Sequence, residues 1–249
     1  MSLFFSEPEN KPSGAIYRDI LQMDNSKVDS MDFNPTPENL KGSYEKDPLK
    51  IYELSFAVVR NEAPLHLLPC VTHDIAIRMI HACGMVDLPQ DLSFSENVVD
   101  TAREALQGGY PILCDCSMVA AGINHNFLKA RNDVIVTLNH STVSQMAKDA
   151  AITRSAAAVD LWKPHIENAV VVIGNAPTAL FRLLENIRAG WPLPSVILGF
   201  PVGFVGARES KSLLVENIFV PFIALHGRRG GSAIAAACVN ALAAGLETG

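Results

Sequence analysis

The 249-residue sequence lacks the features that would direct it to a membrane, out of the cell or onto nucleic acid. No uninterrupted apolar stretch reaches the roughly 20 residues that a transmembrane helix needs. The first seven residues have neither a basic start nor a sustained apolar run. Basic residues are few, since 20 Lys and Arg stand against 26 Asp and Glu, a formal net charge of −6. A nucleic-acid binder would carry an excess of positive charge. We therefore expect a cytoplasmic protein that binds neither membrane nor nucleic acid.

Cysteine is scarce as well, and its number is odd. Five cysteines in a chain without a secretion signal favour reduced thiols over a disulfide framework. Cys114 and Cys116 are spaced so that both would lie on one face of a strand, but no histidine or carboxylate spacing completes a set of metal ligands. We expect buried free thiols and no metal site.

Three common motifs of α/β enzymes are missing. No G-x-x-x-x-G-K-S/T occurs, which argues against a P-loop nucleotide hydrolase. The glycines at 199, 203 and 206 are spaced one residue away from a dinucleotide fingerprint, and no acidic ribose partner follows. Residues 230–234 lack the closing glycine of a nucleophile elbow. A nucleotide-using enzyme remains an alternative, although its usual motifs are absent.

Two regions differ in composition. Residues 1–46 are polar, rich in Pro, Asn, Ser and Asp and without periodicity, which predicts an N-terminal extension. Residues 47–249 form the predicted α/β domain. It begins with Asp47 as a helix N-cap and Pro48 at the first helical position. Further helices are predicted over residues 72–83, 95–107, 153–162, 178–188, 209–217 and 232–246.

Short apolar runs alternate with helical patterns after residue 109, which is typical of βα units and a parallel sheet. We predict a three-layer α/β/α fold with a mostly parallel sheet of about five strands and the N-terminal helices packed on it. The predicted strands are residues 110–114, 134–138, 169–173, 195–199 and 221–225.

The loops that follow these strands are rich in glycine, polar groups and arginine. Ligands of open parallel sheets bind at the carboxyl ends of the strands. Arg228 and Arg229 follow the last strand and precede a helix, so they are candidates for binding ligand carboxylates; the alternative is a solvated turn. Arg60, Arg154 and Arg208 lie beside helix ends and are candidates for the same role or for surface ion pairs. The loops suit a large anionic ligand.

His81 is the strongest candidate for a catalytic group. It lies in the last turn of the helix over residues 72–83, just before Gly84. A helix carboxyl end carries partial negative charge, so we expect His81 to hold its proton more firmly and to act as a general acid. The alternative is a core histidine whose ring is satisfied by its neighbours. His226, which ends a strand, is the next candidate.

Eight short motifs follow one another between residue 47 and the end of the chain. They are SFA at 55–57, RNEA at 60–63, RMIHACG at 78–84, TRSA at 153–156, GNAPTAL at 174–180, GFPVGFVGA at 199–207, ESK at 209–211 and GRRGGS at 227–232.

In this order the motifs resemble the precorrin-8X methylmutase family of corrin biosynthesis. The resemblance implies a homodimeric isomerase without a cofactor, whose active site both subunits share. It moves a methyl group within ring C of the macrocycle, from an alpha carbon to the neighbouring beta carbon, and yields hydrogenobyrinate or the cobalt-bearing cobyrinate. The family's catalytic histidine matches His81, which would protonate or hydrogen-bond to the ring-C nitrogen and so weaken the bond to the migrating methyl.

The resemblance also implies the residues that bind substrate. By motif position they are Ser55, Arg60, Arg154, Gly174, Asn175 and Arg228. The family commonly places threonine or basic residues after the position of Ile123, whereas this chain has Asn124 and His125, so a carboxylate contact has passed to His125 or is lost. A corrin-binding carrier without catalysis remains an alternative, and the sequence leaves open whether the substrate carries cobalt.

Overall fold

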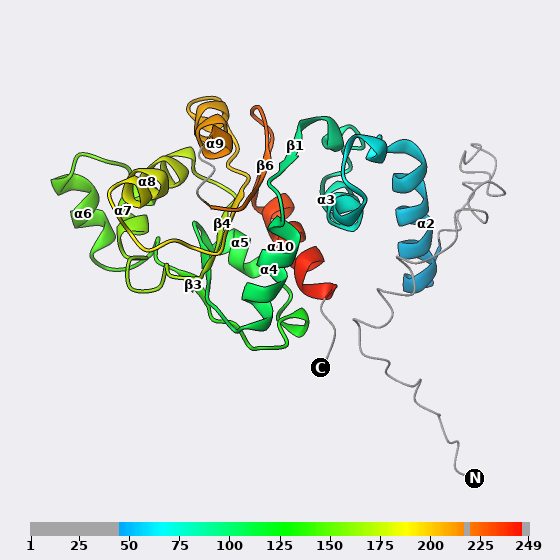
Figure 1. Cartoon of the computed structure of the whole chain (residues 1–249), viewed down its shortest axis with the longest axis horizontal. Coiled ribbons are helices and arrows are strands. Elements are labelled where there is room, and N and C mark those ends of the chain that lie inside the picture. The colour runs from blue at the N-terminus through cyan, green and yellow to red at the C-terminus, as the bar shows by residue number, and fades with distance from the viewer. Residues whose placement is uncertain (1–44, 217–219, 246–249) are drawn as a thin grey trace, which may run out of the picture.

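A six-stranded sheet runs through the middle of the molecule in this computed structural model (Figure 1), which describes residues 45–216 and 220–245. The strand order is β1-β6-β5-β4-β2-β3, and only β1 runs antiparallel to its neighbour. Leu113 of β2 pairs with Ile135 on one side and Val171 on the other. The strands are β1 (Leu92–Phe94), β2 (Ile112–Cys114), β3 (Val134–Val136), β4 (Val170–Ile173), β5 (Val196–Gly199) and β6 (Phe222–Leu225).

The five predicted strands are confirmed, and β1 is an additional one. Ser95 explains why the helix predicted from that residue begins three residues later. Its N–H donates to the Phe222 carbonyl at 3.0 Å, and its hydroxyl accepts from the Phe222 N–H at 2.8 Å. Ser95 thus extends the pairing of β1 with β6 instead of capping a helix. The predicted extension over residues 1–46 lies outside the described residues apart from its last two.

The other predicted helices lie close to their predicted positions, and α5 and α6 are additional helices that were not predicted. Asp47 caps the first one by accepting from the Leu49 N–H at 2.9 Å, and Gly84 ends the next in the left-handed conformation, with φ of +70°. The helices are α2 (Pro48–Glu62), α3 (His73–Cys83), α4 (Val98–Gln107), α5 (Ser117–Gly122), α6 (Val143–Asp149), α7 (Arg154–Asp160), α8 (Pro177–Arg188), α9 (Ala207–Glu216) and α10 (Ser232–Ala244). Short 3-10 turns cover Leu65–Leu67, Cys70–Thr72, Leu88–Asp91 and His125–Phe127.

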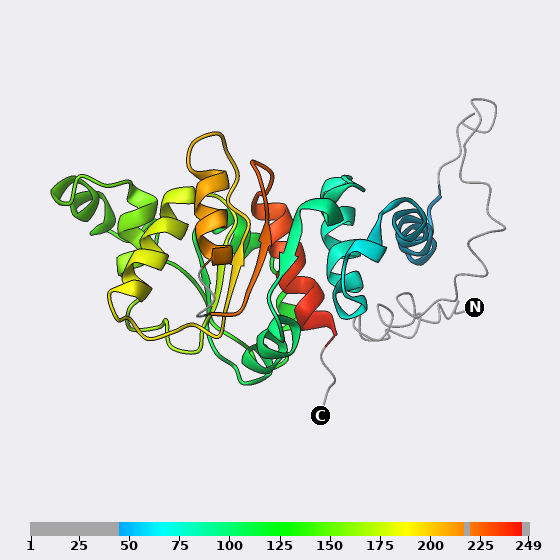
Figure 2. The ribbon, with the colours of Figure 1, turned by 45° about the horizontal axis from the view of Figure 1, so that its top comes forward.

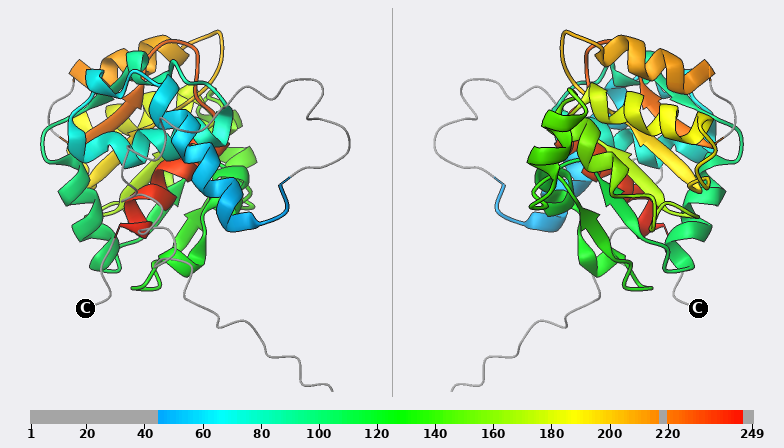
Figure 3. Two further views of the ribbon diagram at one scale, coloured as in Figure 1. Left: turned by 90° about the vertical axis from the view of Figure 1, so that its right-hand side faces the viewer. Right: turned by 90° about the vertical axis from the view of Figure 1, so that its left-hand side faces the viewer.

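Helices cover both faces of the sheet, as predicted. α4, α5 and α10 pack on one face, and α7, α8 and α9 pack on the other. Of the N-terminal helices, α4 packs on the sheet directly, whereas α2 and α3 join the same side of the fold through α10. α3 packs mainly on α10, and α2 packs on α3, so the two helices extend outward from the sheet (Figure 2). Figure 3 shows the opposite ends of the molecule, one formed by α2 and the other by α6, α7 and α8.

The strand order changes direction at β2. The chain passes from β2 to β3 on one side, and then from β4 to β5 and β6 on the other. The loops after β2 and β4 therefore diverge, which in doubly wound sheets forms the crevice where ligands bind. Within the described residues no helix is long and apolar enough to cross a membrane.

Candidate active site

His81 forms a compact cluster with residues of α2. Its Nδ1 lies 2.8 Å from the Ser55 hydroxyl oxygen. The rings of Tyr52 and Phe56 lie with their centroids 5.6 and 5.3 Å from the imidazole. These three residues share one face of α2, because positions three and four apart are neighbours on a helix. His81 remains exposed, so its ring is accessible to a ligand while two aromatic rings fix its position.

The environment of His81 shifts its proton affinity in the direction opposite to the one expected from the helix end. Burial lowers the pKa of His81, and the positive charge of Arg78 lowers it further. The neutral imidazole is therefore favoured near pH 7. The expectation that His81 holds its proton more firmly is wrong, since burial and the charge of Arg78 lower its pKa.

Arg229 ties the end of the His81 helix to the carboxyl ends of the strands. Its guanidinium donates to Asp87 Oδ2 at 2.8 Å and also to the Asp91 carboxylate. Both aspartates follow α3, whereas Arg229 follows β6. The expectation that Arg228 and Arg229 together hold ligand carboxylates is therefore not met for Arg229, because two protein carboxylates already pair with it. His226, the second histidine candidate, pairs through Nε2 with the Ser93 hydroxyl at 2.7 Å.

Arg228 is directed differently from its neighbour. It is exposed, and its guanidinium carbon lies 5.3 Å from the centroid of the Phe204 ring, which is itself 85% exposed. The loop after β5 brings Phe204 to this position, because Gly203 N–H donates to the Arg228 carbonyl at 3.2 Å. An exposed guanidinium beside an exposed aromatic ring can bind a carboxylate and an apolar surface of one ligand.

Gly174 and Asn175 follow β4, at the point where the strand order changes direction. Their backbone N–H groups donate to the Asp115 carboxylate at 2.9 and 3.0 Å, and that of Ala176 does so at 2.8 Å. These donors therefore have a protein partner, and the exposed Asn175 side chain is the group left to meet a ligand. Gly174 is buried, and a Cβ there would lie 2.6 Å from a methyl of Val119.

Asp115 itself was not predicted as a site residue. It is 4% exposed; burial raises its pKa, and the three N–H groups partly oppose that shift. The sequence did contain a signal, since Asp115 directly follows β2 and the glycine of the next loop directly follows the neighbouring strand β4.

Arg154 and Arg60 lie in separate places. Arg154 begins α7, is exposed, and donates through Nη2 to the Leu138 carbonyl just after β3 at 3.2 Å. Arg60 lies in the last turn of α2; burial lowers its pKa, and the charge of Asp74 on α3 raises it. Arg154 and Arg228 follow strands that are four positions apart in the sheet, about 19 Å at 4.8 Å a strand. Only a large ligand would reach both.

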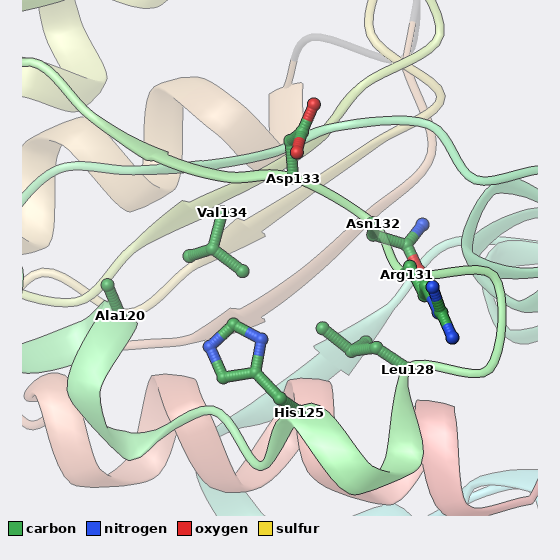
Figure 4. Close-up of a pocket in the computed structure, with 7 residues that line it drawn as sticks. All are labelled: Ala120, His125, Leu128, Arg131, Asn132, Asp133 and Val134. Atoms are coloured by element: carbon green, nitrogen blue, oxygen red, sulfur yellow. The ribbon is translucent and has the colours of Figure 1, made fainter.

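A cavity of about 440 Å³ opens beside the start of β3 (Figure 4). Figure 4 shows the imidazole of His125 pointing into the space between Ala120, Leu128 and Val134. Arg131, Asn132 and Asp133 complete the wall. The cavity is at the amino end of β3, whereas Arg154 and Arg228 follow carboxyl ends. Within one chain His125 is thus apart from these arginines, and its contact with substrate stays a prediction.

In residues 45–216 and 220–245 no three His, Cys, Asp or Glu side chains gather as metal ligands. The five cysteines are free thiols; Cys114, Cys116 and Cys238 are buried, and Cys70 is exposed.

Known proteins share this sequence and fold. The family model "Precorrin-8X methylmutase" matches residues 50–244. The precorrin-8X methylmutase of Pseudomonas aeruginosa is 53% identical over 205 residues, which cover 82% of this chain and 99% of that protein. The cobalt-precorrin-8 methylmutase of Methanocaldococcus jannaschii is 35% identical over 209 residues, which cover 82% of this chain and 96% of that protein. A crystal structure of precorrin-8x methyl mutase from Thermus thermophilus matches with a TM-score of 0.72 and 38% identity, over 80% of this chain and 99% of that one.

Proposed function

The chain belongs to the precorrin-8X methylmutase family, and from this premise we propose that it moves a methyl group within ring C of precorrin-8X with His81 as the proton donor. The enzyme is an isomerase of cobalamin biosynthesis. The bond from the methyl to one ring carbon breaks, and a bond to the neighbouring ring carbon forms. Atoms and electrons balance within the substrate. The protein's task is to hold the macrocycle in place and to draw charge toward the ring-C nitrogen.

The contact between Ser55 and His81 carries the mechanism. Because the pKa of His81 is lowered, its neutral form predominates near pH 7. In the arrangement that we propose, the Ser55 hydroxyl donates to Nδ1 at 2.8 Å, which leaves the proton on Nε2. Nε2–H then donates to the ring-C nitrogen. This hydrogen bond strengthens as charge develops on the nitrogen, so it favours the transition state over the bound substrate.

Binding of the macrocycle is assigned to groups around its rim. Arg154 and Arg228 are exposed and follow strands about 19 Å apart, which suits a substrate whose carboxylates project from a broad ring. The exposed Asn175 follows β4, which lies between those two strands in the sheet. Ser55 adjoins the histidine. Arg60 and Gly174 are also proposed as binding residues; the charge of Asp74 acts on Arg60, and Gly174 is buried.

The assembly and the metal content of the substrate are further parts of the proposal. We propose a cytoplasmic homodimer that shares its active sites; in support, Met118, Phe204 and Val205 are 73%, 85% and 89% exposed near the strand ends. We also propose that the substrate carries no cobalt. The relative at 53% identity is named for precorrin-8X, and the relative at 35% is named for cobalt-precorrin-8.

One assay tests the function. Purified protein is mixed with cobalt-free or cobalt-loaded precorrin-8, and the visible spectrum of the macrocycle is followed over time. We expect fast conversion of the cobalt-free substrate to hydrogenobyrinate. His81→Ala should bind the corrin while losing most of the conversion. Tight binding without turnover by the wild-type protein would instead indicate a carrier, and full turnover by His81→Ala would remove this histidine from the chemistry.

A further inference from the structure

Lys211 is a charged side chain buried without any exposed surface. It lies in the second turn of α9, and its ammonium donates to the Pro201 carbonyl at 3.0 Å and to the Arg229 carbonyl at 2.6 Å. Pro201 belongs to the loop after β5, whereas Arg229 belongs to the loop after β6. A buried lysine is costly unless polar partners surround it, so its place between two loops calls for a reason.

The two loops meet closely around this ammonium. Gly203 N–H donates to the Arg228 carbonyl at 3.2 Å, and Gly231 N–H donates to the Phe200 carbonyl at 2.9 Å. At Gly230 the backbone has φ of +158°, and a Cβ there would lie 2.3 Å from the Phe200 carbonyl oxygen. The loops therefore have one close-packed arrangement, and Lys211 bonds to both of them.

The same loops also carry Arg228, which is assigned to the substrate, and the exposed ring of Phe204. Phe204 and Arg228 stack on one another there, and Arg229 reaches Asp87 beyond the His81 helix. We propose that Lys211 is a positioning residue that joins the two loops and thereby sets Arg228 and Phe204 for the corrin substrate. Since Lys211 is fully buried, it acts through the loops and does not touch the ligand. This inference rests on the proposed function.

The electrostatic setting agrees with that role. Burial lowers the pKa of Lys211 to about 8, and the carboxylate of Asp91 opposes the shift. Asp91 also pairs with Arg229, so its carboxylate stabilises the positive charges of both Lys211 and Arg229. Lys211 therefore keeps enough charge at neutral pH to make strong bonds to two carbonyl oxygens.

The test compares Lys211→Met with Lys148→Met, a control on the exposed side of α6. Methionine keeps most of the length of the side chain and removes its donors. Dissociation constants for hydrogenobyrinate are measured by visible titration, and kcat and KM are measured with precorrin-8X. For Lys211→Met we expect Kd and KM to rise at least tenfold while kcat changes less. The control should match the wild-type protein.

A double-mutant cycle separates positioning from general destabilisation. If Lys211 acts through Arg228, then Lys211→Met adds little to the loss in an Arg228→Ala background. Gly230→Ala forces the same loops apart without changing Lys211 and should weaken binding in the same way. If Lys211→Met does not unfold cooperatively, Gly230→Ala replaces it in the test, and unchanged corrin binding by Gly230→Ala then overturns the positioning role.

The outcomes distinguish the two proposals. Folded Lys211→Met that binds the corrin as the wild-type protein does, or a fully additive cycle, overturns the positioning role alone. A wild-type protein that binds no hydrogenobyrinate overturns the proposed function together with it.

Discussion

Replacing Ser55 by alanine tests whether the serine works through His81, the proposed proton donor. The contact of 2.8 Å between Ser55 Oγ and His81 Nδ1 joins two neutral groups, and such a bond contributes about 0.5–1.5 kcal/mol. If this energy orients the imidazole in the transition state, Ser55→Ala lowers kcat by about 2- to 12-fold. His81→Ala removes the donor itself and should lower kcat by about 100- to 10,000-fold.

The decisive measurement is Ser55→Ala in the His81→Ala background. With the imidazole gone, Ser55 has nothing to orient, so the second substitution should cause no further loss. Initial rates are followed by the visible spectrum of the macrocycle, and kcat and KM are determined separately. Ser144→Ala, on the exposed surface of α6, is a matched control that should leave both constants unchanged. Circular dichroism verifies that each variant is folded.

One result would refute the reasoning. If Ser55→Ala lowers kcat by the same factor with and without His81, the serine acts on the substrate directly. An increase in KM alone would likewise assign Ser55 to binding and leave the tautomer of His81 to another group.

Three other charged groups give measurable quantities. The pKa of His81, followed by NMR, should lie below 6.5 and should rise in Arg78→Gln. Because the neutral ring is the proposed donor, kcat/KM should increase as the pH rises through this pKa. A pKa of His81 above 6.5 in the wild-type protein contradicts the reasoning. Arg154→Ala should weaken corrin binding by about 1.5–3 kcal/mol, whereas Arg188→Ala at the end of α8 should not; an unchanged Kd places Arg154 outside the site. Lys211 releases its proton near pH 8 in the folded protein and near pH 10.5 in the unfolded chain. The difference in unfolding free energy between the wild-type protein and Lys211→Met should therefore increase from pH 8 to pH 10.5 in favour of the wild-type protein. A difference that does not change with pH contradicts this.

The sequence predicted the central strands well because their burial leaves a local pattern. Val170–Ile173 is buried on both faces, so it is a continuous apolar run that needs no knowledge of its neighbours. β1 gave no such signal, since it is three residues long at the edge of the sheet and pairs antiparallel with β6, about 130 positions later. The packing of α3 on α10 depends on contacts between distant segments and was likewise missed.

The candidate site shows the same division. The place of His81 at a helix end follows from nearby residues, and the structure confirms that place. The direction of its pKa shift was not predicted, because the first cause is burial, and residues of another helix, among them Tyr52 and Phe56, pack against the imidazole. The sequence predicted that Arg229 binds a ligand, whereas in the structure it pairs with Asp87 and Asp91, which lie about 140 residues earlier in the chain. Local patterns identify the residue types, whereas the tertiary fold decides which of them are free to act.

The alanine-rich helix α10 separates the His81 helix from the sheet. A helix with no polar face is expected where it is buried all round, and the side chains of α10 are mostly small. Ala236 already leaves no room for a Cβ on Gly122, the distance being 2.6 Å. Because α10 lies between α3 and the sheet, a larger side chain on the side of α10 that packs on α3 would move α3, and His81 with it, relative to the sheet. The position of His81 relative to the sheet thus depends on residues of α10, a helix outside the proposed site.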